Sequence, residues 1–293
     1  MRLCRFGAPG DEKPGVIIEN EQRRIDVSSF GEDFNESFFG SNGIARLRTW
    51  LERNVDACPP VSEPARVAPP ICRPSKIVCV GLNYSDHAAE TNSELPKEPM
   101  LFSKATTAMC GAYDTIIIPR AGAKTDWEVE LAVVIGKRAQ YVSQEDWQDY
   151  VAGYCVMNDV SERAFQKERG GQFIKGKSAD TFAPFGPFLS TVDEVVNPND
   201  LQLRLAVNGE VRQNGSTAAM IFNVPFLVSY ISQFMTLLPG DVISTGTPAG
   251  VGAGCKPPQF LNPGDILEYS VKGLGECRNE VVSFGVYEPT ITA

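Results

Sequence analysis

From Lys76 onward, short segments rich in β-branched and apolar residues alternate with glycine and proline turns. The segments are KIVCVGL, DTIIIP, WEVELAVVIG, GYCVMN, LQLRLAVNG, DVISTGT, DILEYSV and NEVVSFGVY. Pro-Gly supplies the central residues of a type II turn, so PGDVI at 239–243 and PGDIL at 263–267 each predict the start of a strand. Because few helical patterns interrupt these segments, we expect a mostly β (α+β) domain with a few covering helices rather than a Rossmann or TIM fold.

Two segments of this region have the periodicity of amphipathic helices. Segment 143–154 begins with Ser143 as a candidate N-cap, and segment 223–234 begins with Asn223 as N-cap and Pro225 in its first turn. The expected buried stripes are Trp147, Tyr150, Val151 and Tyr154 in the first segment, and Leu227, Tyr230, Ile231 and Phe234 in the second. Both segments are therefore predicted to be helices that cover the β domain.

The first 58 residues have a pattern of their own. GVIIEN and RRIDVSSF predict short strands, and IARLRTWLERN predicts a helix with an apolar stripe of Ile44, Leu47 and Leu51. Residues 59–74 contain six prolines, and proline fixes φ and removes a backbone donor, so an extended connector is expected. We therefore predict a small α+β domain at 1–58, a proline-rich connector at 59–74 and a larger domain at 75–293.

Charge and composition narrow the classes of function. The chain has 36 acidic residues against 27 Lys and Arg, a formal net charge of −9 and no basic cluster, which argues against nucleic acid or an anionic membrane as its main partner. The first residues lack the apolar stretch of a signal peptide, and no run approaches the roughly 20 residues of a membrane span, so a cytoplasmic location is expected. The eight cysteines include no C-x-x-C pair, and reduced, mostly buried thiols are expected.

Segment 125–136, TDWEVELAVVIG, predicts a strand that is buried on both faces. Residues two apart share a face of a strand, so Glu128 and Glu130 point the same way while apolar residues occupy the opposite face. Two ionised carboxylates on a buried face repel each other and lose hydration, which is very unfavourable without a cation. Divalent-cation binding is the favoured interpretation, and a strand that emerges into solvent at residues 126–130 is the alternative.

Asp159 is the candidate for a third metal ligand. It follows the apolar strand GYCVMN and precedes the expected helix VSERAFQKER, where an aspartate is as often a helix N-cap or turn residue. Cap and ligand are equal alternatives at this point. Three oxygen ligands without a second histidine favour a hard cation, Mg²⁺ or Mn²⁺, over zinc or copper.

The chain contains one histidine, His87. A histidine-rich zinc site is therefore excluded, as is the two-histidine helix motif of metalloproteases. If SDHAAE forms the first turn of a helix, His87 and Glu90 lie side by side, and a carboxylate beside an imidazole orients it and raises its basicity, as a general base requires. A surface histidine in an ordinary helix turn is the alternative.

Two lysines and a glycine-rich loop complete the candidates. Lys104 in MLFSKATTAM and Lys177 in FIKGKSADTFAPFGP could bind a substrate carboxylate, although lysines that extend to the surface are commoner. The loop STGTPAGVGAG at 244–254 offers backbone amides near Thr245 and Thr247, with a tight glycine turn as the alternative to anion binding. It lacks the spacing of the nucleotide-binding loops.

Six motifs occur in the order found in the fumarylacetoacetate hydrolase family. They are GLNYSDHAAE, FSKATTAM, DWEVELAVVIGK, GYCVMNDVSERAFQ, KGKSADTFAPFGP and PGDVISTGTPAGVG. The chain resembles this family over roughly residues 75–285, and its short NYSDHAAE motif is more similar to the acylpyruvate and diketo-acid branch than to fumarylacetoacetate hydrolases proper. The longer motif of the latter brings a further carboxylate to the metal, and such a role for Asp86 or Asp126 stays open.

The resemblance implies a mixed β-roll or β-sandwich catalytic domain, usually a homodimer, with Mg²⁺ or Mn²⁺ held by Glu128, Glu130 and Asp159. It further implies a lid dyad of His87 and Glu90, a catalytic Lys177, and substrate-binding positions at Gln166, Arg163, Lys104 and Thr247.

The activity implied by the resemblance is hydrolytic C–C cleavage of a 2,4-dioxo acid, either an acylpyruvate or a sugar-derived 2,4-diketo-3-deoxy acid. His87, oriented by Glu90, would remove a proton from water, hydroxide would attack the C4 carbonyl, and the C3–C4 bond would break to leave pyruvate enolate. Oxaloacetate decarboxylation, 2-hydroxydienoate isomerisation and ureidoglycolate cleavage are near alternatives on the same scaffold. A non-catalytic metal- or ligand-binding β-protein is the alternative from a different class.

Overall fold

The computed structural model describes residues 1–18, 23–62, 64–90 and 94–285, except for the side chains of residues 87–89. Within these residues the strands form two large sheets and one two-stranded sheet. The larger contains β1 (Arg2–Phe6), β2 (Lys13–Ile18), β3 (Arg23–Asp26), β4 (Val67–Ala68), β5 (Ile77–Gly81), β6 (Met100–Lys104), β7 (Met109–Gly111), β10 (Val129–Ile135), β11 (Val151–Asn158), β13 (Ala183–Thr191) and β16 (Val242–Ser244). The smaller contains β8 (Ile116–Ile118), β14 (Gln202–Val207), β15 (Glu210–Ser216), β17 (Ile266–Val271) and β18 (Glu276–Ser283), and β9 (Thr125–Asp126) pairs separately with β12 (Ser161–Glu162).

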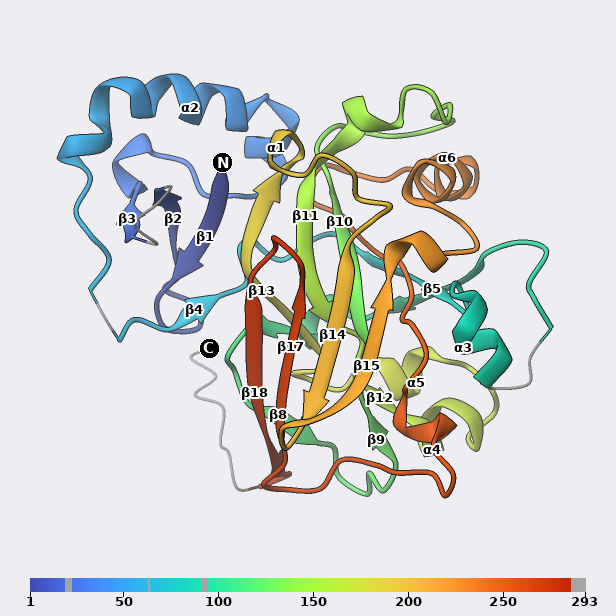
Figure 1. Cartoon of the computed structure of the whole chain (residues 1–293). Coiled ribbons are helices and arrows are strands. Elements are labelled where there is room, and N and C mark those ends of the chain that lie inside the picture. Colours follow the sequence, from blue (N-terminus) through green and yellow to red (C-terminus); the bar gives the residue numbers. More distant parts are fainter. Residues whose placement is uncertain (19–22, 63, 91–93, 286–293) are drawn as a thin grey trace.

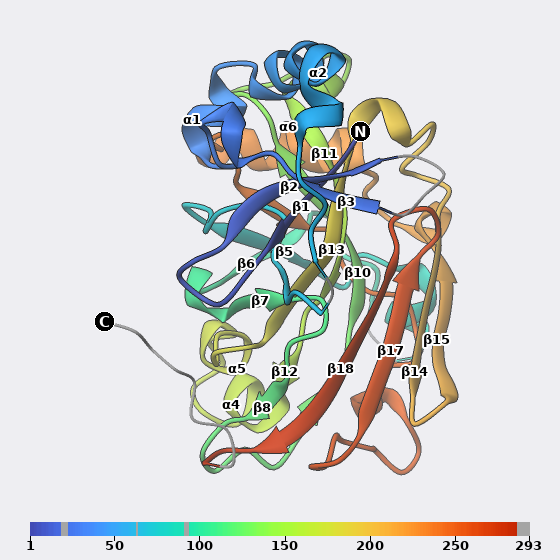
Figure 2. The same ribbon diagram turned by 90° about the vertical axis from the view of Figure 1, so that its left-hand side faces the viewer.

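The two sheets pack face to face (Figure 1). Strands β14, β17 and β18 lie as a separate layer against β10, β11 and β13 (Figure 2). In this outer layer buried and more exposed residues alternate along β17, most of β18 and the first half of β14, as expected of a sheet with one face toward solvent. Strands β10 and β11 are buried at every residue, which confirms the expected burial of both faces of the 125–136 segment. The prediction of a mostly β, mixed-sheet fold is confirmed.

The larger sheet has the order β3-β2-β1-β13-β11-β10-β16-β5-β6. Strand β16 is short and central, because it pairs antiparallel with β10 and parallel with β5. It begins directly after Pro239-Gly240-Asp241, and β17 begins directly after the second PGD, so both predicted strand starts are confirmed.

Helices surround the sheets: α1 (Glu36–Gly40), α2 (Gly43–Asn54), α3 (Ser85–Glu90), α4 (Arg163–Lys167), α5 (Ile174–Lys177) and α6 (Val224–Phe234). The expected helices at α2 and α6 are confirmed, and the Asn223 side chain caps α6 by accepting from the Phe226 amide at 3.0 Å. The buried face of α6 is narrower than predicted. Leu227 and Ile231 are buried, whereas Phe234 is 63% exposed.

The helix predicted over 143–154 is wrong. A short 3-10 helix covers Trp147–Tyr150, and β11 begins at Val151. Strand β11 lies between β10 and β13, where Tyr154 pairs with Val133 on one side and Ser190 on the other. Backbone pairing on both edges therefore overrides the local periodicity.

The N-terminal strands extend the larger sheet, since β1 pairs with both β2 and β13. Helices α1 and α2 lie beside these strands (Figures 1 and 2). The division into 1–58, 59–74 and 75–293 stays a prediction. All eight cysteines fall in the described ranges as free thiols, six of them buried. Among the described residues no helix has the length and apolar character that a membrane crossing requires.

Asn83→Ala is expected to lower the free energy of unfolding by about 2–4 kcal/mol, because three buried hydrogen bonds are lost and their partners stay buried. The Asn83 side chain donates to the carbonyls of Phe222 (3.0 Å) and Thr245 (2.7 Å) and accepts from the Phe222 amide (2.8 Å). Urea unfolding measures the change. Asn54→Ala, which removes one hydrogen bond to Trp50 at a helix end, is the control, and an equal loss in both variants would contradict the argument.

Candidate active site

Three carboxylates converge where β10 and β11 meet. Glu128 precedes β10, Glu130 lies within it and Asp159 follows β11, and ligand oxygens of all three lie within 4.8 Å of one another. The strand register causes this, because Val129 pairs with Asn158 and the Asp159 amide donates to the Glu128 carbonyl at 2.8 Å. The solvent-exposed alternative for this segment is therefore wrong, since Glu128, Glu130 and Asp159 are 6%, 2% and 0% exposed.

Two buried lysines neutralise part of this cluster. Lys177 Nζ lies 2.6 Å from Glu128 Oε2 and 2.7 Å from Asp159 Oδ2. Lys104 Nζ lies 2.6 Å from Asp159 Oδ1 and donates to the Val160 carbonyl at 3.0 Å. Both ammonium groups are thus directed at carboxylates rather than at the surface. The carboxylates raise the pKa of Lys177, whereas burial lowers the pKa of Lys104.

Asp159 is not a helix cap. Its two carboxylate oxygens face the lysines, and helix α4 begins four residues later at Arg163, where Glu162 is the N-cap and accepts from the Ala164 amide. Of the two sequence alternatives for Asp159, the structure favours a place in the carboxylate cluster.

The negative charge of Glu130 is less well compensated than those of Glu128 and Asp159. Its Oε2 accepts from Ser244 Oγ at 2.5 Å and from the Gly246 amide at 2.8 Å. Ser244 is the last residue of β16, and Gly246 lies in the loop that follows. Burial, together with the negative charges of Asp159 and Glu128, raises the pKa of Glu130 well above its usual value. Among the described residues Glu130 forms no ion pair, unlike Glu128 and Asp159.

The cluster fits a divalent cation. Lys104, Lys177 and Arg163 form ion pairs with Asp159 and Glu128, and oxygen atoms of these two carboxylates and of Glu130 converge at one place. Buried carboxylates without a cation are unfavourable, and a hard ion such as Mg²⁺ or Mn²⁺ prefers this donor set.

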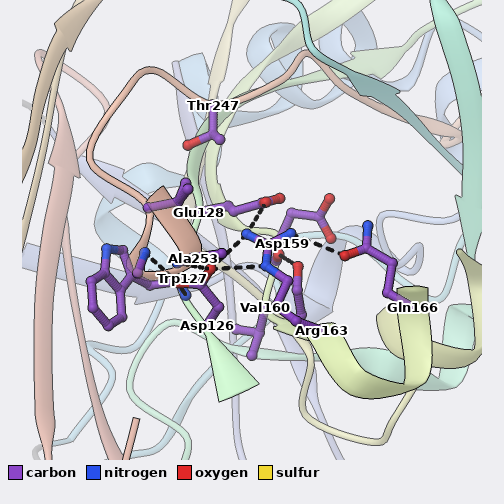
Figure 3. A network of polar contacts seen from close by, with 12 residues as sticks. Asp126, Trp127, Glu128, Asp159, Val160, Arg163, Gln166, Thr247 and Ala253 are labelled. Carbon is purple, nitrogen blue, oxygen red and sulfur yellow. Dashed lines mark hydrogen bonds and ion pairs between the residues drawn. The ribbon is translucent and has the colours of Figure 1, made fainter. Parts of the chain in front are cut away.

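Arg163 forms the second part of the site (Figure 3). Its guanidinium lies 2.6 Å from Glu128 Oε1 and 2.8 Å from Asp126 Oδ2, and it donates to Gln166 Oε1 at 3.1 Å. With its Oε1 accepting from Arg163, Gln166 keeps its amide nitrogen as a donor. Asp126 lies outside the convergent cluster, with both its oxygens directed at N–H donors, so the structure gives it no place as a metal ligand.

A cavity of about 210 Å³ opens above these residues. Six predicted site residues line it, namely Glu128, Glu130, Arg163, Gln166, Lys177 and Thr247. Thr247 Oγ1 donates to the Val129 carbonyl and accepts from the Gln213 side-chain amide. Lys104 contacts Asp159 but is not part of the cavity wall.

Several wall residues are not among those that the sequence predicts. Met100, Phe102 and Phe173 make one side apolar, and Phe102 packs edge-to-face on Phe173 at 5.5 Å between centroids. Lys167 also reaches the wall, directly after Gln166. No local pattern marks these residues, because the packing of β6 and the later helices against each other brings them to the cavity.

Glu90 approaches the site from helix α3, which the sequence predicted correctly. Its carboxylate accepts from the Gly250 amide with both oxygens at 3.1 Å, so α3 is docked on the 244–254 loop. His87 belongs to the same helix, but its side chain lies outside the described residues. The predicted contact between His87 and Glu90 therefore stays a prediction.

Comparison with known proteins agrees with this geometry. Residues 76–282 match the family model described as fumarylacetoacetate (FAA) hydrolase C-terminal. A Burkholderia multivorans relative, whose name says only that it is a presumed hydrolase, is 49% identical over 94% of this chain and 97% of its own length.

Two solved structures resemble the whole chain. Maleylpyruvate hydrolase from Sphingobium sp. SYK-6, in complex with manganese(II) and pyruvate, is 29% identical over 97% of this chain and 99% of its own, with a TM-score of 0.81. The 2-hydroxyhepta-2,4-diene-1,7-dioate isomerase from Mycobacterium marinum is 34% identical over the same shares, with a TM-score of 0.75.

With a mixed two-sheet fold and a buried carboxylate site, the protein belongs to a class of metal-binding enzymes built on β-strands. More particularly, the chain is a member of the fumarylacetoacetate hydrolase family.

Proposed function

We propose that this protein is a Mg²⁺- or Mn²⁺-dependent hydrolase of the acylpyruvate branch, which cleaves the C3–C4 bond of a 2,4-dioxo acid. The products would be pyruvate and a carboxylic acid, and the substrate an acylpyruvate or a sugar-derived 2,4-diketo-3-deoxy acid. The observation that carries the proposal is the buried carboxylate cluster with Lys177 at the cavity wall. The maleylpyruvate hydrolase structure supports the proposal, because it contains manganese(II) and pyruvate, and pyruvate is a product of the proposed reaction.

Glu128, Glu130 and Asp159 are the proposed metal ligands. A divalent ion bound there would act as a Lewis acid toward the oxygens of a 2-oxo acid. Lys177 would contribute a fixed positive charge beside these oxygens, and the amide nitrogen of Gln166 would donate toward the acyl half of the substrate.

Proton transfer is assigned to the pair of His87 and Glu90. The Gly250 amide holds the Glu90 carboxylate, and Glu90 would in turn orient the His87 imidazole. His87 would accept a proton from water, and the hydroxide would add to the C4 carbonyl. Collapse of this adduct breaks the C3–C4 bond, with the bonding electrons passing to C3 as pyruvate enolate, and a proton then completes the methyl group of pyruvate.

His87→Ala is expected to lower kcat about 10²–10⁴-fold while the affinity for Mn²⁺ stays that of the wild type, because the imidazole transfers protons and the proposed ligands are carboxylates. Pyruvate release followed by NMR measures the rate, and calorimetric titration measures the ion. Added imidazole, which can replace the missing base, is the control for an intact pocket. A variant with the wild-type rate would show that another group is the base.

Isomerisation of a 2-hydroxydienoate is the second candidate, favoured by the similarity to the Mycobacterium marinum isomerase. It needs the same ion and a proton shift but no attack by water. Oxaloacetate decarboxylation and ureidoglycolate cleavage are further alternatives on this scaffold. NMR product analysis with acylpyruvates, sugar-derived diketo acids, a 2-hydroxydienoate, oxaloacetate and ureidoglycolate separates these reactions. Ion binding without turnover of any of them would indicate a non-catalytic binding protein.

The family resemblance also leads us to propose a homodimer in the cytoplasm with a small-molecule 2-oxo acid as its partner. Analytical ultracentrifugation of the purified chain tests the oligomeric state, since a 31.9 kDa species would contradict the dimer.

A further inference from the structure

Asp126 is a fully buried carboxylate to which the proposed reaction assigns no role. Its Oδ2 accepts from Arg163 Nε at 2.8 Å and from the Ala253 amide at 3.0 Å. Its Oδ1 accepts from the amides of Trp127 at 2.8 Å and Gly252 at 2.7 Å. In Figure 3, Asp126 lies between the Arg163 guanidinium and Ala253. One side chain thus joins a cavity-wall arginine to the loop that follows β16.

That loop, residues 247–254 and here called the glycine loop, also holds Glu90. The Gly250 amide donates to both Glu90 oxygens, and the Gly250 carbonyl accepts from Trp127 Nε1 at 3.0 Å. A Cβ on Gly254 would lie 2.5 Å from Glu90 Cδ, so the carboxylate packs directly on the loop backbone. The Asp126 contacts at Gly252 and Ala253 lie between these two Glu90 contacts.

We propose that Asp126 is a positioning residue that fixes Glu90 through the glycine loop and fixes Arg163 at the cavity wall. The inference rests on the proposed function, in which Glu90 orients the general base. Asp126 would not touch the substrate. It positions Arg163, which lies at the cavity wall, and Glu90, which orients the general base.

The charge of Asp126 is what this role requires. The groups directed at its oxygens are three backbone N–H groups and two guanidinium nitrogens, all of them donors. Asparagine has the same size but replaces one oxygen with an NH₂ group, which would face donors. Asp126→Asn therefore keeps the side-chain volume. It disrupts either the hydrogen bonds at Oδ2, which include the one from Arg163, or those at Oδ1, which include the one from Gly252.

Hydrogen exchange of the metal-free protein tests the structural half of the proposal without any turnover. In Asp126→Asn, amides 250–253 should exchange about tenfold or more faster than in the wild type. Glu90→Gln should accelerate Gly250 alone. The control is Asp241→Asn, because Asp241 is equally buried and binds Lys76 and the Leu238 amide outside the cavity. It should leave exchange of the glycine loop unchanged.

Kinetics test the functional half. Asp126→Asn should lower kcat about a hundredfold, as expected for a misplaced base, with Mn²⁺ affinity retained. Its effect should be less than multiplicative with that of Glu90→Gln, because both substitutions displace the general base. Asp241→Asn should keep the wild-type kcat in its folded fraction.

The outcomes separate the two proposals. Unchanged exchange of the glycine loop in Asp126→Asn overturns the positioning role whatever the activity, and so do multiplicative effects of the two substitutions on kcat. Absence of wild-type turnover on dioxo acids counts against the proposed function, while the exchange data still decide whether Asp126 holds the Glu90 loop. If Asp126→Asn does not fold, Trp127→Phe, which removes the indole bond to the Gly250 carbonyl, should accelerate exchange of Gly250 and lower kcat.

Discussion

Glu130→Gln is expected to weaken Mn²⁺ binding about a hundredfold without destabilising the metal-free protein. The glutamine carbonyl can still accept from Ser244 and Gly246, which bind one oxygen of Glu130 in the wild type. The substitution removes a carboxylate that forms no ion pair among the described residues, and whose pKa is raised by burial and by the negative charges of Asp159 and Glu128. Loss of this repulsion offsets the loss of a charged hydrogen-bond acceptor, whereas the ion loses a ligand.

Calorimetric titration with Mn²⁺ measures the affinity, and urea unfolding with and without Mn²⁺ measures stability. In the wild type, free Mn²⁺ at about 1,000 times its Kd adds about 4 kcal/mol to the free energy of unfolding, and the same concentration should add about 1.4 kcal/mol in the variant. Glu162→Gln is the matched control, because Glu162 is equally buried but binds Thr125 and the Lys124 amide. The assignment of Glu130 is wrong if both variants bind Mn²⁺ as the wild type does.

Lys177→Met, by contrast, should destabilise the metal-free protein and lower its free energy of unfolding by about 3–5 kcal/mol. Methionine fills a similar volume but leaves Glu128 and Asp159 buried without the ammonium that lies between them. Saturating Mn²⁺ should recover part of this stability, because the ion compensates the same carboxylates. The rate of dioxo-acid cleavage should fall about 10²–10³-fold, since a fixed charge at the reacting oxygens is lost.

Lys124→Met is the control for Lys177→Met. Lys124 pairs with Glu168 at the surface, where an ion pair contributes at most about 1 kcal/mol. Urea unfolding of both variants at matched Mn²⁺ concentrations gives the comparison. Equal stability of Lys177→Met and wild type in the absence of metal would contradict the proposed charge balance of the cluster.

The part of the site that the sequence predicted well depends on local geometry. Alternation along one strand is enough to place Glu128 and Glu130 on the same face, and the apolar neighbours indicate that this face is buried. Helix α3 likewise follows from a short local motif.

Other features depend on pairings that no local pattern records. Asp159 joins the cluster because β11 pairs with β10 in one register, and a shift by one residue would direct it away. The same pairing makes Val151 and Tyr154 part of a strand, although their spacing fits a helix. Lys104 and Lys177 have side chains long enough to reach either solvent or the carboxylates, so only the surrounding structure decides between the two.

The central position of β16 has a consequence for how the chain is made. Its neighbours β5 and β10 are synthesised first, and at about 5–20 residues per second the ribosome adds β16 roughly 5–20 s after β10. During this interval the facing edges of β5 and β10 lack the strand that later joins them. Unpaired strand edges can form backbone hydrogen bonds with other polypeptide chains. Biosynthesis therefore completes the glutamate-bearing half of the sheet only when Ser244 and the residues that follow it have left the ribosome.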